Sequence, residues 1–186
     1  IERHKRIKIF KPTGLKNALV RIEYKSYQRF EKISDINAQT INLDAKGSII
    51  YSKLDKQQLI DEPIEGGNNQ ITFTMPDAMP GCVLEYSYKI RSSRFKAIPA
   101  WYFQTTLPTQ LSEVIVSMPD LYTIKSSPHC PGTILADSSE TFEQDIFTPG
   151  DLNATRCKGV KKRFSVASMA AFTSEPQSLP TRELLC

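Results

Sequence analysis

Short runs in which large apolar residues alternate with polar ones constrain the fold of this chain more than any other feature. Successive side chains of a β-strand point to opposite faces, so such a run can bury every second residue. Pro, Gly, Asn or Asp separates many of the runs, as is typical of strands joined by turns. The in-phase residues of four runs are Ala18, Val20, Ile22 and Tyr24; Ile71, Phe73 and Met75; Leu84, Tyr86, Tyr88 and Ile90; and Val114, Val116 and Met118.

These runs recur at roughly ten-residue spacing without alternating helices, which predicts an all-β antiparallel β-sandwich, with a barrel as the alternative. Helical patterns are weak. Residues 26–42 fit a helix by propensity and a bulged strand about as well, and residues 181–186 could begin one helical turn. A chain of 186 residues predicts one domain, which we place at residues 1–170. Residues 171–186 hold two prolines and polar spacers and predict a linker or strap toward a further domain.

Three connections carry turn residues. "KPTGLKN" (residues 11–17) predicts a hairpin between the strands on either side of it, with Pro12 and Gly14 supplying the bend. "DAKG" (residues 44–47) predicts a tight turn between two further strands. "MPDAMPG" (residues 75–81) predicts a two-proline turn that leads into the strand of residues 82–92.

The stretch from Gly81 to Gln104 holds the single tryptophan. We expect the strand of residues 82–92 to be followed by a returning strand at residues 100–106. Trp101 and Phe103 would then pack in the core against Tyr86 and Tyr88, because aromatic cross-strand pairs stabilise sheets. The alternative is a carbohydrate-binding module, which needs exposed aromatic rings. Its ligand-binding residues would be Trp101, Tyr102 and Tyr122.

Charge gives little indication of a nucleic-acid partner. The net charge is +4, from 24 Lys and Arg against 20 Asp and Glu. The two basic runs, residues 3–8 and 158–163, lack the interleaved aromatic residues that stack on bases. We therefore expect solvated basic faces and no nucleic-acid binding. No segment has the apolar length of a membrane span, so we expect no membrane insertion by this segment.

The cysteines Cys82, Cys130, Cys157 and Cys186 do not have the short spacing of a zinc site. Two interpretations stay open. In an exported protein we would pair Cys130 with Cys157, both of which lie in turn-like surroundings. Otherwise all four are reduced thiols, with Cys82 buried in a strand and Cys186 at the end of the chain.

Catalytic chemistry is not indicated. Cysteine catalysis needs a thiolate, a histidine base and an orienting group brought together. The histidines are His4 and His129, and His129 adjoins Cys130, yet neighbours along a strand point to opposite faces. Acidic residues are scattered through turns rather than spaced as a calcium loop, and no phosphate-binding glycine loop is present. We predict no catalytic residues, no metal and no cofactor.

Four segments, taken in order, resemble the domain of unknown function 3857, a family of bacterial exported proteins in which this domain precedes a transglutaminase-like domain. The resemblance covers residues 3 to 176, although residues 126–160 are not a clear match. The matching residues are Lys5, Arg6 and Ile7; Ile36, Ala38, Thr40 and Asn42; Gly81, Glu85, Tyr86 and Tyr88; and Trp101, Phe103, Gln104 and Pro108.

The resemblance implies an immunoglobulin-like β-sandwich in the periplasm or at the cell surface, with no established catalytic role. It therefore implies a non-catalytic accessory domain that binds or positions a downstream transglutaminase-like domain, another protein or a glycan. The chain begins inside a strand-like pattern, so we expect it to be cut from a longer protein. Residues 172–182 are the candidate contact with the neighbouring domain.

Overall fold

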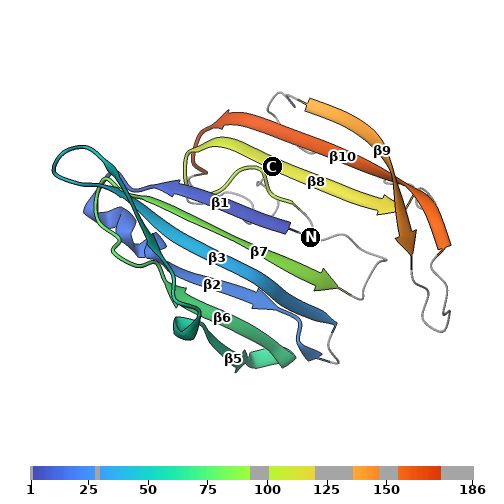
Figure 1. Ribbon diagram of the computed structural model, residues 1–186, viewed down its shortest axis with the longest axis horizontal. Coiled ribbons are helices and arrows are strands. Elements are labelled where there is room, and N and C mark those ends of the chain that lie inside the picture. Colours follow the sequence, from blue (N-terminus) through green and yellow to red (C-terminus); the bar gives the residue numbers. More distant parts are fainter. Residues whose placement is uncertain (1, 28–29, 93–100, 120–135, 147–154, 173–186) are drawn as a thin grey trace, which may run out of the picture. The chain divides into compact units, whose positions relative to one another are not determined.

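The computed structural model describes residues 2–27, 30–92, 101–119, 136–146 and 155–172 (Figure 1). The described residues form antiparallel β-sheets joined by turns and short 3-10 helices, so the all-β prediction is confirmed. The chain divides into two compact units, Ile1–Ile98 and Pro99–Cys186. The domain predicted over residues 1–170 thus spans both units. The predicted strap of residues 171–186 lies outside the described residues beyond Phe172.

The first unit contains two antiparallel sheets, with strand orders β1-β7-β3-β4 and β2-β6-β5. Short 3-10 helices lie in its connections. In chain order its elements are β1 (Glu2–Lys8), η1 (Pro12–Ala18), β2 (Leu19–Tyr24), β3 (Glu31–Leu43), β4 (Ile49–Lys53), η3 (Lys56–Gln58), β5 (Ile60–Ile64), η4 (Glu65–Gly67), β6 (Asn68–Thr74) and β7 (Val83–Ser92).

The second unit contains one described sheet, in which β10 (Thr155–Met169) lies between β8 (Thr109–Pro119) and β9 (Ala136–Ile146). Ser112 and Val166 are buried, whereas Leu111 and Ile115 are exposed. Residues 114–118 lie in β8, as the period-two pattern predicts, and the in-phase residues Val114 and Val116 are half-buried.

A single apolar core joins the two sheets of the first unit. Alternation in β2, β6 and β7 places every second side chain toward this core, as predicted. Tyr86 packs edge-on against Phe73 and stacks with Tyr88. Burial raises the pKa of the Tyr86 hydroxyl to about 12. The buried members of the core are Ile9, Ala18, Val20, Ile22, Ile33, Ala38, Ile71, Phe73, Met75, Cys82 and Leu84.

The β3–β4 hairpin forms at the predicted tight turn. The Asp44 N–H donates to the Ser48 carbonyl at 2.9 Å, and the Asp44 carboxylate accepts from the backbone N–H groups of Lys46 and Ser48. Gly47 has a φ of 82°, a left-handed conformation that glycine adopts without steric cost. Of the two interpretations of residues 26–42, the bulged strand is confirmed, because β3 shifts register between Ser34 and Asn37.

The predicted hairpin at residues 11–17 is wrong. Residues 12–18 form the 3-10 helix η1, which starts with a proline near its first position, and the strands on either side belong to different sheets. Proline suits the first turn of a helix because its fixed φ is already helical and its missing N–H has no partner there. The connection therefore crosses from one sheet to the other.

The returning strand at residues 100–106 is also wrong for the residues that the structure describes, because residues 101–108 form no strand. A strand has two edges, and both edges of β7 are already occupied, by β1 and β3. The strand β7 is instead an interior strand of a four-stranded sheet.

Candidate functional site

A row of polar side chains crosses the face of the β1-β7-β3-β4 sheet opposite the core. Glu85 of β7 stands directly between Arg6 of β1 and Gln39 of β3, and Gln39 pairs in turn with Lys53 of β4. Directly opposed residues of an antiparallel pair share one face and lie close enough to interact. Strand register alone thus places both basic and acidic groups on this surface.

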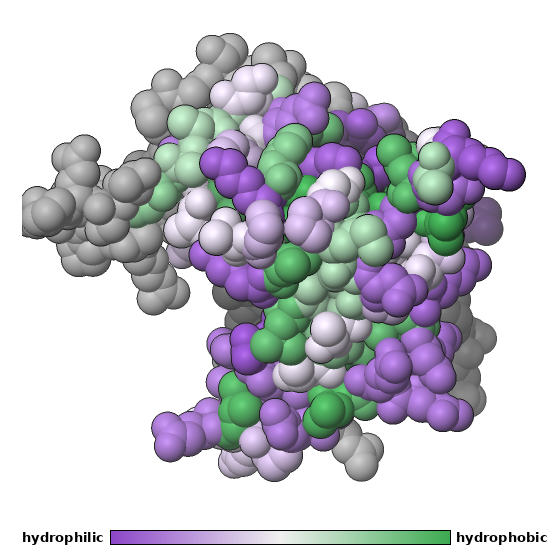
Figure 2. Space-filling model, turned by 90° about the vertical axis from the view of Figure 1, so that its left-hand side faces the viewer, coloured by the Kyte–Doolittle hydropathy of each residue, from purple (hydrophilic) through white to green (hydrophobic). Residues whose placement is uncertain are grey.

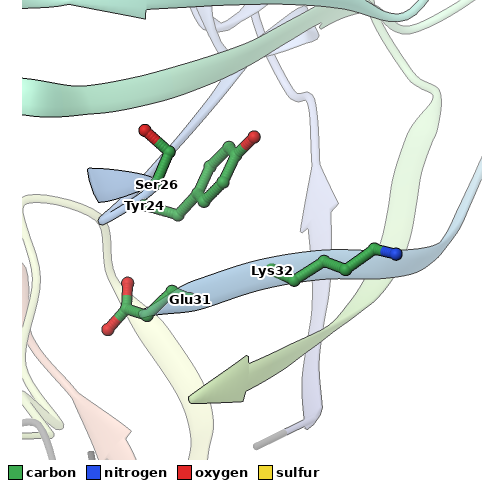
Figure 3. A pocket seen from close by; sticks show the side chains of 4 residues that line it. All are labelled: Tyr24, Ser26, Glu31 and Lys32. Carbon is green, nitrogen blue, oxygen red and sulfur yellow. The ribbon is translucent and has the colours of Figure 1, made fainter. Parts of the chain in front are cut away.

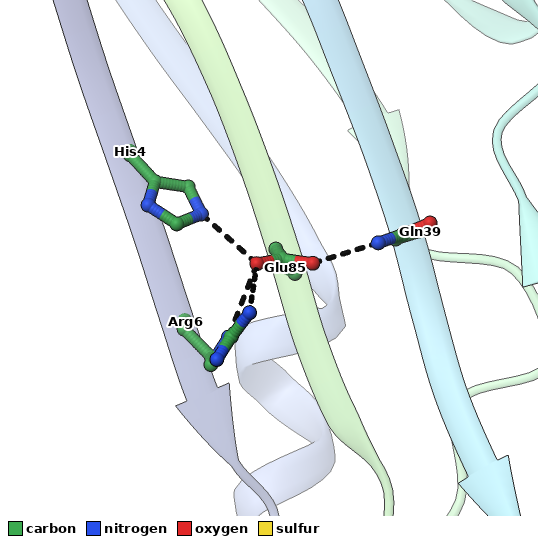
Figure 4. Close-up of polar contacts among 4 residues, drawn as sticks. All are labelled: His4, Arg6, Gln39 and Glu85. Atoms are coloured by element: carbon green, nitrogen blue, oxygen red, sulfur yellow. Dashed lines mark hydrogen bonds and ion pairs between the residues drawn. The ribbon is translucent and has the colours of Figure 1, made fainter. Parts of the chain in front are cut away.

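The Glu85 carboxylate accepts hydrogen bonds from three side chains (Figure 4). One of its oxygens is bonded by His4 Nε2 at 3.0 Å and by the Arg6 guanidinium, whose Nε lies 3.1 Å away. The other oxygen accepts from Gln39 Nε2 at 2.7 Å. The carboxylate side chain is only 15% exposed, so its charge is held in one geometry by donors from both neighbouring strands.

These contacts lower the pKa of Glu85. The hydrogen bond from Gln39 has the largest effect, while partial desolvation acts in the opposite direction and the contacts with Arg6 and His4 lower the pKa further. A carboxylate with a lowered folded-state pKa stabilises the fold above its unfolded pKa, and that stabilisation is lost as the pH falls through the folded value. The contacts of the Glu85 carboxylate should therefore stabilise the fold less in acid.

Glu85→Gln tests this expectation. At pH 7 we expect the substitution to lower the free energy of unfolding by about 1 kcal/mol, because the charged acceptor is lost while the shape is kept. The difference from wild type should shrink as the pH falls from neutral into the acid range in which Glu85 itself is protonated. Urea unfolding curves at several pH values measure it. A difference that stays constant across this range would show that the charge of Glu85 plays no part.

A hollow of about 410 Å³ lies beside this row. It is open to solvent and offers hydrogen-bond donors, acceptors and both signs of charge, a surface suited to a polypeptide rather than to an enclosed small molecule, since small-molecule sites are mostly apolar and concave. The polar residues that line it are His4, Asn37, Gln39, Lys53, Lys56, Glu85 and Ser87.

A second hollow of about 410 Å³ is lined by Tyr24, Ser26, Glu31 and Lys32 (Figure 3). Three of these side chains, Tyr24, Ser26 and Glu31, are bonded within the fold. The Tyr24 hydroxyl donates to Asp61, Ser26 Oγ donates to Asn69, and Glu31 accepts from the Lys25 N–H. We therefore assign these contacts to structure, because they hold the end of β2 against its neighbours.

Of the three residues predicted for carbohydrate binding, two lie among the described residues. Trp101 and Tyr102 are half-buried, and Trp101 Nε1 donates to Ser112 Oγ at 3.3 Å. Tyr122 lies outside the described residues.

The cysteine predictions fall mostly outside the described part of the chain. Cys82 is a buried free thiol, as expected, but it lies just before β7 rather than within a strand. Cys130 and Cys186 lie outside the described residues, as does His129, and nothing is described of the Cys157 side chain. The proposed Cys130–Cys157 pairing therefore stays a prediction.

The described residues contain no group of three or more His, Cys, Asp or Glu side chains placed to hold a metal ion. They also contain no helix with the length and apolar character needed to cross a membrane.

Sequence reasoning missed the Glu85 row. It assigned the basic run at residues 3–8 to a solvated face and placed Glu85 on the polar face of its strand, but did not pair the two. A signal was present, because β1 presents alternate basic residues and β7 carries a single acidic residue on its polar face. Only the register between the strands joins them.

Comparison with known proteins gives a family and a fold. No curated protein matches the chain. The crystal structure of a putative protease from Parabacteroides distasonis matches with a TM-score of 0.61 and 13% sequence identity, over 96% of this chain and 34% of that chain. At this identity the likeness concerns the fold alone, and the chain spans about a third of the length of that protein. The family described as Domain of Unknown Function with solved-structure structure, DUF3857, matches residues 1–145. The chain therefore belongs to the DUF3857 family.

Proposed function

We propose that the chain is a non-catalytic accessory domain of an exported bacterial protein that also carries a transglutaminase-like domain, and that it binds or positions a polypeptide for that domain. The observation that carries this proposal is the unequal coverage of the structural match. The fold accounts for nearly all of this chain but only about a third of a longer protein described as a protease. Most of that protein's chain therefore lies outside the matched fold.

The chemistry of the described residues supports a binding role. Cys82 is buried in the core, so its thiol is not accessible to a substrate as a nucleophile. The open polar hollow beside Glu85 offers contacts to a polypeptide surface. Binding sites on β-sandwiches commonly use exposed sheet edges and loops held by a rigid scaffold.

The test compares three proteins: the full-length gene product, the same product without residues 1–186, and residues 1–186 alone. Fluorescently labelled casein serves as the substrate. We expect hydrolysis by the full-length protein, a changed rate without residues 1–186, and none by residues 1–186 alone. Casein cleavage by residues 1–186 alone, or a gene product without a second domain, would contradict the proposal.

Cell fractionation tests the proposed location. The full-length product should appear in the periplasmic or surface fraction, with a cytoplasmic enzyme as the control for leakage. Recovery together with that cytoplasmic enzyme would contradict export.

A further inference from the structure

The strand β4 forms one edge of the four-stranded sheet in the first unit. Among the described residues it pairs only with β3. Its apolar side chains are unusually exposed for a strand: Ile49 is 58%, Ile50 46% and Tyr51 56% exposed. On β3, Leu43 pairs with Ile49 and is 65% exposed. Figure 2 shows one side of the molecule, where apolar side chains lie at the surface among hydrophilic ones.

Two backbone hydrogen bonds at the ends of the β3–β4 pair show which residues of β4 bond to β3. The Asp44 N–H donates to the Ser48 carbonyl, and the Leu54 N–H donates to the Ala38 carbonyl, each at 2.9 Å. Residues of an antiparallel pair bond toward the partner at every second position. Ile50 and Ser52 therefore bond to β3, whereas the N–H and C=O groups of Ile49, Tyr51 and Lys53 point to the open edge.

Lysines surround this open edge. Lys46 lies in the turn before β4, Lys53 ends the strand, and Lys56 lies just beyond it in η3; all three are exposed. Within the described residues none of them forms an ion pair. The neighbouring carboxylates of Asp44 and Asp55 accept backbone N–H groups of their own turns. The edge thus presents three exposed lysines around a short apolar strand, and with Asp44 and Asp55 included these five side chains carry a net charge of +1, from three positive and two negative groups.

We propose that β4 is a docking edge for an extended acidic polypeptide segment, which adds to the sheet as a fifth strand. Outward backbone groups of Ile49, Tyr51 and Lys53 would bond to it, as in other cases of strand addition. Alternate apolar side chains of the segment would cover Ile49 and Tyr51 on one face and Ile50 on the other. Acidic residues at its two ends would meet Lys46 on one side and Lys53 and Lys56 on the other.

The lysines around β4 favour an acidic polypeptide over a basic one as the added strand. Lysines on an edge strand oppose pairing with another basic strand, which is how proteins avoid edge-to-edge aggregation, but they attract an acidic one. The proposal rests on the proposed function in one respect, because it names the class of polypeptide that the accessory domain would hold. A peptide titration involves no catalytic domain, so its failure leaves open a positioning role through another surface.

The probe is a capped nine-residue peptide with two glutamates at each end and alternating valine and threonine between them. The control peptide has lysines in place of the glutamates. Each is titrated into the isotope-labelled chain and followed by the amide signals of β4, which give both the dissociation constant and the place of binding. We expect saturable binding of the acidic peptide, shifts centred on β4, and at least tenfold weaker binding of the lysine peptide.

Two sets of variants separate charge from backbone pairing. The double substitution Lys53→Glu and Lys56→Glu should raise the dissociation constant by about tenfold, since it reverses two charges. Lys16→Glu, an exposed lysine in η1, is the matched control and should change it less than about twofold. Tyr51→Pro removes an outward N–H and should weaken binding about fivefold relative to Tyr51→Thr, which keeps it.

Three results would overturn the proposal: no binding of the acidic peptide, equal binding of both peptides, or equal binding by Tyr51→Pro and Tyr51→Thr. A fourth result that would overturn it comes from sedimentation of the chain without peptide. Self-association that Tyr51→Pro abolishes would make the occupant a second copy of this chain.

Discussion

Replacing Phe73 by alanine is expected to lower the free energy of unfolding by about 4 kcal/mol. The side chain is 2% exposed, lies on β6 at the centre of the core between the two sheets, and meets the Tyr86 ring edge-on with centroids 6.1 Å apart. Loss of a buried phenylalanine costs roughly 3–5 kcal/mol, because the transfer energy is lost and a cavity remains. The aromatic pair contributes about 1 kcal/mol of this.

Phe10→Ala is the matched control, since the Phe10 side chain is 81% exposed and its removal should change the free energy by less than about 0.5 kcal/mol. Urea unfolding followed by circular dichroism measures both variants. If the two variants lose similar stability, Phe73 is not in a shared core and the two sheets do not pack through it.

The success of this core assignment shows what alternation alone can predict. In β2, β6 and β7 the in-phase residues named from the sequence are buried or packed against the core, because burial of one face is a local property of a strand. The same pattern says nothing of which strands are neighbours. Two predictions failed because that information was missing. The hairpin predicted at residues 11–17 is a crossing between sheets through η1, and the returning strand predicted at residues 100–106 is not formed, since residues 101–108 form no strand.

The candidate site was less predictable than the core. Glu85, Arg6 and Gln39 come from three strands, and their contacts depend on the register of β1 with β7 and of β7 with β3. A bulge between Ser34 and Asn37 sets the second register, and one residue of slip would turn Gln39 toward the core. No short motif contains this information, because the residues are far apart in sequence and individually ordinary.

The sequence also did not predict that β4 lies at the edge of its sheet. The turn at residues 44–47 was predicted, since its aspartate and glycine have local conformational reasons to lie there. Whether the second strand of a hairpin ends as an edge or continues into a sheet depends on what lies beyond it. In the described structure the chain leaves through η3 and enters the other sheet at β5, which leaves one side of β4 unpaired among the described residues.

Ile50→Pro and Tyr51→Pro, one residue apart on β4, are expected to destabilise the fold to very different extents. The Ile50 N–H points to the Asn42 carbonyl of β3, because the Asp44–Ser48 and Ala38–Leu54 contacts set the bonding parity of the pair. Proline at position 50 removes that hydrogen bond and places its ring against β3, which should cost about 3 kcal/mol. The Tyr51 N–H points to the open edge, where proline is tolerated, so Tyr51→Pro should cost less than about 1 kcal/mol.

Amide exchange of Ser52 and Leu54 distinguishes these outcomes, because both N–H groups point to β3 in the hairpin. Exchange at these sites should accelerate strongly in Ile50→Pro and little in Tyr51→Pro, while exchange at Phe73 in the core should stay slow in both variants. Equal acceleration would mean that the Tyr51 N–H is already bonded in the folded chain. The open edge, and with it the docking of an acidic strand, would then be wrong. The predicted contrast would instead make Tyr51→Pro a folded variant, so that any loss of peptide binding reports on the edge itself and not on the stability of the sheet.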